Sequence, residues 1–469
     1  MDGAPPSEAP NELTQRLDEL TAEGFVRALR GVDAQLFSGW CGFPGLLDAR
    51  TLLAAENATV SSAMVMRRGG TIVLTGCGTS GRIAFLTARR YQLLSQRPER
   101  FAYLISGGDA AILLSDELPE DDAEEGAAQL TALAKGKPAV SLIGISCGLS
   151  APYVAGQLAY AFAAQTVSEL VAAAAEDEIH AATAGSSSAA FSLAPAYASV
   201  AATGFATCAI GFNPVAHARN TPIAALGNRS FRDIVVAIDD SAAHCTSHNV
   251  LNPVVGPEAV AGSSRLKGGS ATLALADAMC YRALALAEAA PARLSDVDTV
   301  PKLLPLLLAA QQAVHETYAH PEALAGIATL AANAMRAGGR LFYIGAGVAG
   351  IIGCIDASEM PDTFGVPFDT VRGFVQGGWA TMRNREGNVG GAGSPLLCLS
   401  IADFERDVLP TIGAADCVLL IGCGREPRRA APIPSSDSAL PTPSMWGLVP
   451  KVRECFKITV TFHAIPSHS

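Results

Sequence analysis

The chain is poor in basic residues: 33 lysines and arginines stand against 44 aspartates and glutamates, which gives a formal net charge of -11. A surface of that sign repels nucleic acid and acidic membranes, so neither is expected as a partner. The sequence also lacks a long apolar segment, because its longest charge-free run, 181–216, is interrupted by Ser, Gly, Pro and Thr. We therefore expect no membrane-spanning helix.

Cysteine pairs and metal-ligand clusters are also missing. The eleven cysteines include no CxxC pair, which favours buried, reduced thiols in a cytoplasmic protein. The stretch HCTSH at 244–248 offers two histidines and one cysteine, too few ligands for zinc, and we interpret it as a surface loop. The opening MDGAPPSEAP has no basic or apolar region typical of a secretory signal. No metal and no cofactor is expected.

The sequence does contain a pattern typical of phosphate binding. The β-branched and apolar residues Thr71–Thr75 predict a buried strand, and Gly76 and Gly78 allow a tight turn after it. Thr79 and Ser80 then stand where a helix would begin. Unpaired amides and the positive end of the helix dipole make such a turn an anion site, and the hydroxyls add donors for a phosphate ester. We call residues 76–80 the cradle.

The segments around the cradle indicate a parallel α/β sheet. At 469 residues with 49% hydrophobic content, the chain has enough core for two to three domains. Helices are expected over 11–38 and 46–68, from the acidic segment 116–125 through 133, and from 152 onward; strands are expected over 101–106, 139–145, 205–211 and 233–238. Ligands bind such sheets beyond the carboxyl ends of the strands. The Ala/Ser-rich stretch 167–202 is interpreted as an insertion.

A second motif, GPEAVAGSSRLKGGS, precedes a long apolar helix predicted over 271–289. One interpretation is a helix cap with two solvated cations. The other is an oxyanion site, because the glycines and prolines impose a definite backbone path and Arg265 suits bidentate binding of an oxyanion. We favour the second interpretation.

The pattern then restarts. Helices are predicted up to 318 and over 321–337, followed by a strand over 340–344 and the sequence GAGVAG, whose glycines match those of the cradle at a constant offset. Val348 and Ala349 replace Thr79 and Ser80, so only the first copy keeps the hydroxyl donors. A strand is predicted over 417–423, and the Pro/Ser-rich stretch that follows leaves the second sheet with fewer strands.

Gly76, Gly78 and Gly81 also satisfy GxGxxG, the dinucleotide-binding fingerprint. That fingerprint needs an acid closing the second strand, where this chain has Ser106 and two glycines, with Asp109 a poor substitute. It also gives no role to the Thr-Ser pair or to the GSSRLK motif. We therefore set nicotinamide binding aside.

GCGTSGR together with GPEAVAGSSRLKGGS resembles the sugar-isomerase-type (SIS) phosphosugar-binding family, and within it the glucokinase regulatory proteins and the related N-acetylmuramic acid 6-phosphate etherases. The resemblance implies two tandem SIS domains, flavodoxin-like three-layer αβα units with parallel sheets, which pair as a pseudo-dimer. The implied boundaries are N-terminal helices at 1–56, a first domain at 57–291 and a second domain at 292–469, incomplete and of low complexity from 424. In the family a helical cap follows the second domain. We do not expect such helices in this sequence up to Ser469.

The resemblance also implies a set of ligand-binding residues. Phosphate would meet the serines and threonine of the cradle and of the loop after the third strand, where Gly148 permits close approach; carboxylates would lie near the sugar. The implied set is Gly78, Thr79, Ser80, Glu117, Glu120, Ser146, Gly148, Ser150, Ser264, Arg265 and, contributed by the second domain, Glu359.

Binding without turnover is the function that we expect. Arg90 stands in the first copy where the second has Glu359, so neither copy alone has both the acid and the phosphate donors. The resemblance then implies a regulator that binds fructose 6-phosphate or fructose 1-phosphate and inhibits a glucokinase or hexokinase, in the cytoplasm or nucleus. The alternative is an etherase-like lyase in which Glu117 and Glu359 move protons while a lactyl ether is cleaved. Aldose–ketose isomerisation ranks third.

Overall fold

The computed structural model describes residues 5–95, 97–114, 118–165, 204–242, 245–289, 302–389 and 397–422. The expected insertion at 167–202, the low-complexity stretch from 424 and Glu117 lie outside these residues. The chain divides into two compact units. Unit 1 comprises the described parts of Met1–Glu19, Arg27–Ser106 and Asp116–Ala319, and unit 2 those of Leu20–Val26, Gly107–Ser115 and His320–Ser469. The boundaries inferred from the resemblance stay a prediction.

Unit 1 is built on a five-stranded parallel sheet in the order β2-β1-β3-β4-β5. The strands are β1 (Thr71–Gly76), β2 (Phe101–Ile105), β3 (Ala139–Ile145), β4 (Gly204–Ile210) and β5 (His248–Leu251). Every residue of β1 and β3 is buried, because helices cover both faces of the sheet. Parallel pairing brings the loops after β1, β2 and β3 to one edge, as the sequence predicted.

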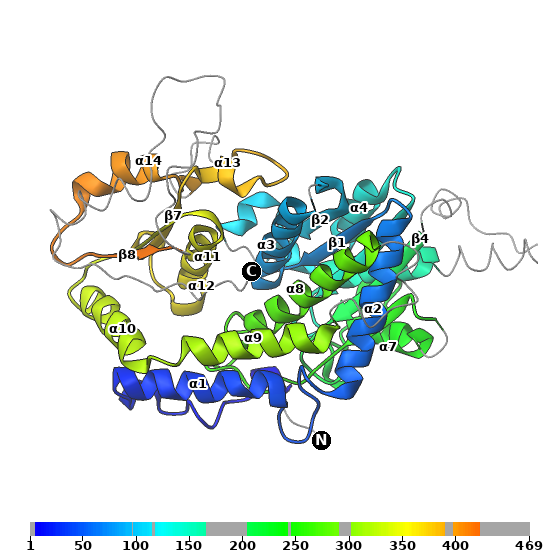
Figure 1. The fold of residues 1–469 in the computed structure, drawn as a ribbon, viewed down its shortest axis with the longest axis horizontal. Coiled ribbons are helices and arrows are strands. Elements are labelled where there is room, and N and C mark those ends of the chain that lie inside the picture. Colours follow the sequence, from blue (N-terminus) through cyan, green and yellow to red (C-terminus); the bar gives the residue numbers. More distant parts are fainter. Residues whose placement is uncertain are drawn as a thin grey trace, which may run out of the picture. The chain divides into compact units, whose positions relative to one another are not determined.

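Helices form the two outer layers of unit 1 (Figure 1). The helices with residues in unit 1 are α1 (Ala22–Ser38), which begins in unit 2, α2 (Ala49–Arg67), α3 (Gly78–Leu94), α4 (Ala123–Ala134), a helix at 152–165, α7 (Phe231–Ala242), α8 (Lys267–Glu288) and α9 (Leu303–Thr317), which packs on α8 and α2. On one face, α4, the helix at 152–165 and α7 share a buried core with the sheet. On the other, α2 and α3 pack on the strands and against α8. The unit is therefore a three-layer αβα sandwich.

The prediction of a strand over 233–238 is wrong, because these residues belong to α7. The β-branched run DIVVAI suggested a strand. In the structure, Phe231, Ile234, Val235 and Ile238 are the buried residues of the helix. Their spacing of three and four residues is that of one helix face, so the helical period decided the conformation and not the local composition.

The interpretation of 244–248 as a surface loop is wrong at its end. His248 begins β5, is 1% exposed and packs its ring edge-on against Phe162 at 4.9 Å. The imidazole of His248 thus packs in the core as an aromatic ring. Among the described residues, no group of His, Cys, Asp or Glu could hold a metal ion. No described helix is both long and apolar enough to cross a membrane.

Unit 2 contains a three-stranded parallel sheet in the order β7-β6-β8. The strands are β6 (Leu341–Gly345), β7 (Val371–Val375) and β8 (Cys417–Ile421), and the helices are α10 (Pro321–Arg336), α11 (Gly347–Ser358), α12 (Met360–Phe364), α13 (Gly378–Met382) and α14 (Ile401–Asp403). One face of the sheet packs on α10 and α11, and the other on the helical segment that starts at Ile401. Unit 2 is thus a second αβα layer structure.

Short helical turns connect these elements. They are Pro6–Glu8, Leu17–Glu19, Pro98–Arg100, Asp109–Ile112, Leu118–Asp121, Val215–His217, Ala224–Leu226, Phe368–Thr370 and Leu409–Thr411, with a π-turn at Phe404–Val408. The acidic segment was expected to begin α4. Its part Leu118–Asp121 instead forms one of these short turns. Asp122 then caps α4 by accepting a hydrogen bond from the amide of Glu125 at 2.9 Å, which is a structural role.

The internal repeat extends further than the glycine turns. The strand order β7-β6-β8 matches β2-β1-β3, and the residue after the outer strand bonds the end of the central strand in both copies: Ser106 N donates to Gly76 O and Gln376 N to Gly345 O. A Gly-Gly pair with positive φ follows each time, at 107–108 and at 377–378. Only residues with little steric restriction adopt this conformation readily, which explains the shared glycines.

Candidate functional site

The cradle forms the turn between β1 and α3. Gly78 has φ +47°, and a Cβ on Gly76 would lie 2.7 Å from the carbonyl carbon of Ser80, so both positions favour glycine for steric reasons. Within the described residues, the N-cap Cys77 makes no side-chain cap to α3, and the first turn of this 17-residue helix carries no acid. The N-cap side chain therefore does not occupy this end of the helix, where the positive end of the dipole favours an anion. Ser80 lies here, 8% exposed.

The loop after β3 meets the cradle from the neighbouring strand. Ser146 Oγ accepts hydrogen bonds from the amides of Ser150 at 3.0 Å and Ala151 at 3.3 Å, which holds the loop that leads into the helix at 152–165. Its lone pairs are thus used within the loop, and its proton is left to donate to a ligand oxygen. Leu149 holds the bend with φ +53° and a fully buried side chain. Ser150 is exposed at the rim, and Gly148 is half-buried beside it.

Cys147 joins three of the expected ligand-binding segments. Its Sγ lies 3.5 Å from Ser80 Oγ and 3.9 Å from Thr272 Oγ1 on α8, and the Ser264 hydroxyl is a further hydrogen-bond partner. Burial raises the pKa of Cys147, so the thiol is neutral and unreactive at physiological pH. The segments that hold Ser80, Ser146 and Ser264 therefore converge on one buried sulfur atom. The sequence did not predict that Cys147 connects these segments. The one signal was the position of Cys147 between Ser146 and Gly148.

The GPEAVAGSSRLKGGS motif encloses the start of α8. The helix begins at Lys267, earlier than the predicted 271, and Glu258 accepts hydrogen bonds from the amides of Lys267 at 2.7 Å and Gly268 at 2.8 Å. Glu258 is 2% exposed, and burial raises its pKa to about 7. A carboxylate of this chain thus occupies the N-terminus of α8, which leaves that helix end no place for a ligand anion.

Lys267 is not a solvated cation. Its side chain is fully buried, Nζ donates to Gln35 Oε1 of α1 at 2.7 Å, and burial lowers its pKa to about 8. Gln35 also accepts from Asn11 Nδ2 at 3.2 Å, and the same nitrogen bonds Pro257 O at 2.8 Å. The interpretation of two solvated cations is therefore wrong for Lys267. Its contacts fix the motif to the N-terminal segment, and Ser264 and Arg265 lie half-buried in the loop held in this way.

Carboxylate and cationic groups also lie near the cradle. Glu120 Oε1 would be 3.3 Å from a Cβ on Gly78, so this carboxylate lies over the start of α3, where it can accept hydrogen bonds from sugar hydroxyls. Arg219 was not anticipated from the sequence. Its Nη1 bonds Asp121 Oδ1 at 3.2 Å and Ser150 O at 3.4 Å, linking the acidic turn to the loop after β3.

Arg90 and Glu359 stand at equivalent positions of the two copies. Arg90 is near the end of α3, about 18 Å along the axis from its first turn at 1.5 Å per residue, and pairs with Asp277 of α8 at 2.8 Å. It is therefore a structural cation of the helix layer. Glu359 follows α11 in unit 2 and is 8% exposed. Its expected contribution to the sugar site stays a prediction, as does that of Glu117.

Comparisons with known proteins agree with this architecture. Family models of the glucokinase regulatory protein N-terminal SIS domain and second SIS domain match residues 56–162 and 318–423. The chain is 32% identical over 432 residues to glucokinase regulatory protein of Xenopus laevis and 31% identical over 427 residues to that of Homo sapiens. Each alignment covers 89% of this chain and 61% of the relative, so the chain spans about three fifths of the relatives' length.

The etherase resemblance is shorter. N-acetylmuramic acid 6-phosphate etherase of Gloeobacter violaceus is 36% identical over 156 residues, covering 33% of this chain and 48% of that enzyme. The etherase of Serratia proteamaculans is 29% identical over 276 residues, which cover 57% of this chain. The regulatory proteins align over 89% of the chain, and both of their SIS-domain models match it in tandem. The chain belongs to the glucokinase regulatory protein family, to which the N-acetylmuramic acid 6-phosphate etherases are related.

Proposed function

We propose that this chain is a phosphosugar-binding regulatory protein, which senses fructose 6-phosphate or fructose 1-phosphate and inhibits a glucokinase. The observation that carries the proposal is the convergence of the segments holding Ser80, Ser146 and Ser264 at the uncapped N-terminus of α3. Helix N-termini with free amides favour phosphate. The kinase is proposed from the names of the curated relatives.

Each part of the site has a distinct role in the proposal. The first-turn amides of α3, with the hydroxyls of Thr79 and Ser80, bind the phosphate oxygens, and Ser146 donates from the neighbouring loop. Arg265 adds charge, while Glu120 accepts from the sugar hydroxyls. Gly148 and the exposed Ser150 line the approach, and Glu117 and Glu359 complete the carboxylates around the sugar.

Regulation follows if the phosphosugar binds two conformations of the protein with different affinity. Such a ligand shifts the population toward the conformation that it prefers, and the affinity for a kinase changes by the same coupling free energy. No covalent step is required. The proposed site binds and releases its ligand unchanged.

Calorimetric titration with fructose 6-phosphate, fructose 1-phosphate and N-acetylmuramic acid 6-phosphate tests the binding. Loss of one hydrogen bond to a charged phosphate is expected to weaken affinity about tenfold or more in Ser80→Ala. Ser38→Ala, an exposed serine at the end of α1, is the matched control and keeps wild-type affinity. Affinities that are equal in the two variants would contradict the site.

A glucokinase assay tests the regulatory half separately. The chain is expected to slow a glucokinase in a dose-dependent way, and fructose 1-phosphate or fructose 6-phosphate is expected to change that inhibition. Phosphosugar binding without any effect on the kinase would leave the site intact and refute the proposed inhibition.

An etherase-like lyase is the second candidate, favoured by the 36% identity to an etherase over 156 residues. Glu117 and Glu359 would then transfer the protons during elimination of the lactyl group. Incubation with N-acetylmuramic acid 6-phosphate decides between the candidates: release of lactate supports the lyase, and binding without release supports the regulator.

A further inference from the structure

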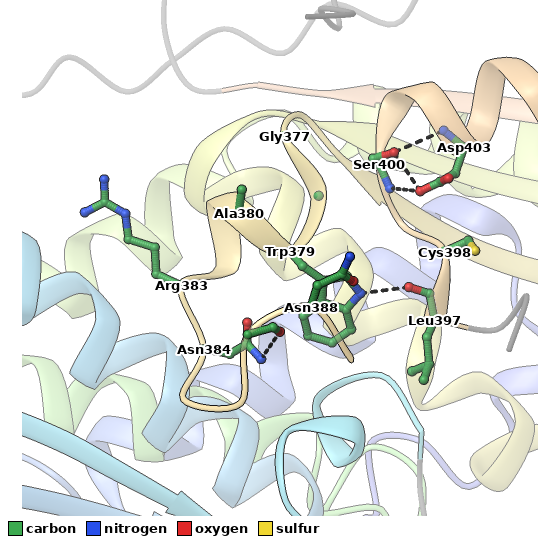
Figure 2. A pocket seen from close by; sticks show the side chains of 12 residues that line it. Gly377, Trp379, Ala380, Arg383, Asn384, Asn388, Leu397, Cys398, Ser400 and Asp403 are labelled. Carbon is green, nitrogen blue, oxygen red and sulfur yellow. Dashed lines mark hydrogen bonds between the residues drawn. The ribbon is translucent and has the colours of Figure 1, made fainter. Parts of the chain in front are cut away.

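Unit 2 contains a cavity that the proposed function does not use. Its volume is about 590 Å³, within the range of small-molecule sites. It lies beyond the carboxyl end of β7, between the Gly377–Gly378 turn with α13 and the segment Leu397–Ser400, which pairs with Val375 (Figure 2). The carboxyl edge of a parallel sheet is the edge at which such folds bind ligands.

The chemistry of this cavity differs from that of the cradle. Among the described residues that line the cavity, Ser400 alone carries a hydroxyl, and it donates to Asp403 Oδ2 at 2.6 Å, so a phosphate would lack the hydroxyl donors that unit 1 offers. Two of the described residues that line the cavity bear charge, Arg383 and Asp403. Figure 2 shows the guanidinium of Arg383 directed away from Trp379 and Asn388, and Asp403 is bonded to Ser400. Arg406 also pairs with Asp403 at 2.8 Å. The cavity therefore favours a neutral ligand.

An aromatic ring and amides line the same cavity. Trp379 is 8% exposed, and its Nε1 donates to Leu397 O at 2.8 Å, which fixes the indole. Asn384 is also 8% exposed; its Nδ2 bonds Asp109 Oδ2 at 2.9 Å and Gly387 O at 2.7 Å. Its Oδ1 is buried and has no hydrogen-bond partner in the part of the chain that the structure describes. A buried carbonyl oxygen without a partner costs free energy unless a ligand donates to it.

Asn388 adds an exposed amide at the same cavity, with both donors and an acceptor. Arg383, at the end of α13, has φ +46°, a backbone conformation that non-glycine residues adopt at a cost. Strain of this kind often occurs at binding sites. The position at the strand ends, the fixed indole and the unpartnered acceptor thus point to the same function.

We propose that this cavity binds a small, neutral, hydroxyl-rich molecule, namely an unphosphorylated sugar or polyol. One hydroxyl donates to Asn384 Oδ1, others exchange hydrogen bonds with Asn388, and the apolar face of the ligand lies near Trp379. The two units then take ligands of different charge: a phosphate ester in unit 1 and its unphosphorylated counterpart in unit 2.

Tryptophan fluorescence tests the proposal with glucose, fructose, sorbitol and N-acetylglucosamine as probes, each beside its 6-phosphate. At least one neutral probe is expected to give a saturable change that Trp379→Phe abolishes, and its phosphate is expected to bind no more tightly. Absence of saturable binding by every neutral probe would overturn the proposal. Tighter binding of the phosphates at this site would overturn it as well.

Variants of the cavity locate the binding by equilibrium dialysis. Asn384→Ala is expected to weaken affinity about tenfold. Because Asn384 also bonds Asp109 and Gly387, the exposed Asn388→Ala provides a second variant that keeps these contacts, and Asn333→Ala on α10 is the matched control. Ser80→Ala keeps wild-type affinity for the neutral probe. Wild-type affinity in both cavity variants, or its loss in Ser80→Ala, would refute a site in unit 2.

Discussion

Ser80 and Ser146 both offer hydroxyls near the start of α3, but their other contacts differ. Ser80 Oγ faces the neutral thiol of Cys147, a weak partner, whereas Ser146 Oγ accepts from two backbone amides. The sequence indicated both as phosphate donors and could not separate these roles, because the amides that use Ser146 depend on how the loop closes.

Substitution of the two serines is expected to separate binding from stability. Ser146→Ala leaves the amides of Ser150 and Ala151 without their side-chain acceptor, so the free energy of unfolding falls by about 1 kcal/mol, and phosphosugar affinity falls too. Ser80→Ala lowers affinity by a similar factor, with an unfolding free energy close to wild type. Urea denaturation measures the first quantity and calorimetry the second. Equal stability losses in the two variants would contradict the role of Ser146 in holding this loop.

Glu258 is a residue whose structural role the GPEAVAGSSRLKGGS motif did not reveal. Its carboxylate accepts from two amides of α8, and that role needs the loop 259–266 to fold back on the helix. The motif identified Glu258 as part of a resemblance but did not indicate this contact. Nor did the sequence reveal that Lys267 is buried and bonded to Gln35.

Glu258→Gln is expected to destabilise the chain. The amide of glutamine offers one acceptor oxygen, so one N–H of α8 loses its partner, at a cost of about 1–3 kcal/mol. Thermal or urea unfolding measures this loss. Glu288→Gln is the control, because Glu288 forms an exposed pair with Arg100 and such pairs contribute about 0–1 kcal/mol. A Glu258 variant as stable as the control would contradict the capping role.

At the scale of elements, periodicity was the reliable signal and local composition the unreliable one. The strands β1, β2, β3 and β4 and the helices α9 and α10 lie where apolar runs and helical spacing predicted them. The run 233–238 was assigned to a strand from its β-branched content, although its buried residues keep helical spacing. The start of α8 was misplaced because its cap, Glu258, lies far back in the sequence.

In unit 2, an ion pair connects the residues that precede the neighbouring strands β6 and β8. Arg340 precedes β6 and Asp416 precedes β8; Arg340 donates from its guanidinium at 2.8 Å and from its amide at 2.7 Å to the carboxylate of Asp416. Burial alone would raise the pKa of Asp416, but the hydrogen bonds from Arg340 and from the amide of Gly413 outweigh it and hold the pKa below its ordinary 3.8. The ionised form is therefore stabilised by folding.

Asp416→Asn is expected to destabilise unit 2 in a pH-dependent way. The depressed pKa means that this carboxylate stabilises the folded state above pH 3.8, and that its contribution is lost as the pH falls through the lower folded-state pKa. The variant is thus less stable than wild type at pH 7, by about 1–3 kcal/mol, and the gap narrows below pH 3.8.

Urea unfolding at several pH values measures that gap. Asp362→Asn, an exposed aspartate on α12, is the control and changes stability little at any pH. A gap that stays constant as the pH falls below 3.8 would contradict the account of Asp416.

At the scale of the whole molecule, the duplication is the feature that the sequence revealed best. The glycine turns, the strand order and the Gly-Gly pairs after β2 and β7 repeat in both units. Hydroxyl donors were retained at Thr79 and Ser80 and replaced at Val348 and Ala349. The convergence of Cys147, Thr272 and Ser264 could not be predicted, because it depends on three segments that are distant in the sequence and meet only after the sheet forms.

The central claim is that the hydroxyl-bearing turn of unit 1 binds the phosphate of a sugar phosphate. Its most direct test copies the second turn into the first: fructose 6-phosphate affinity is measured by calorimetry for wild type and for Thr79→Val/Ser80→Ala. Loss of two hydrogen bonds to a charged group predicts affinity about a hundredfold weaker or more, with an unchanged unfolding midpoint. Wild-type affinity in the double variant would contradict the claim.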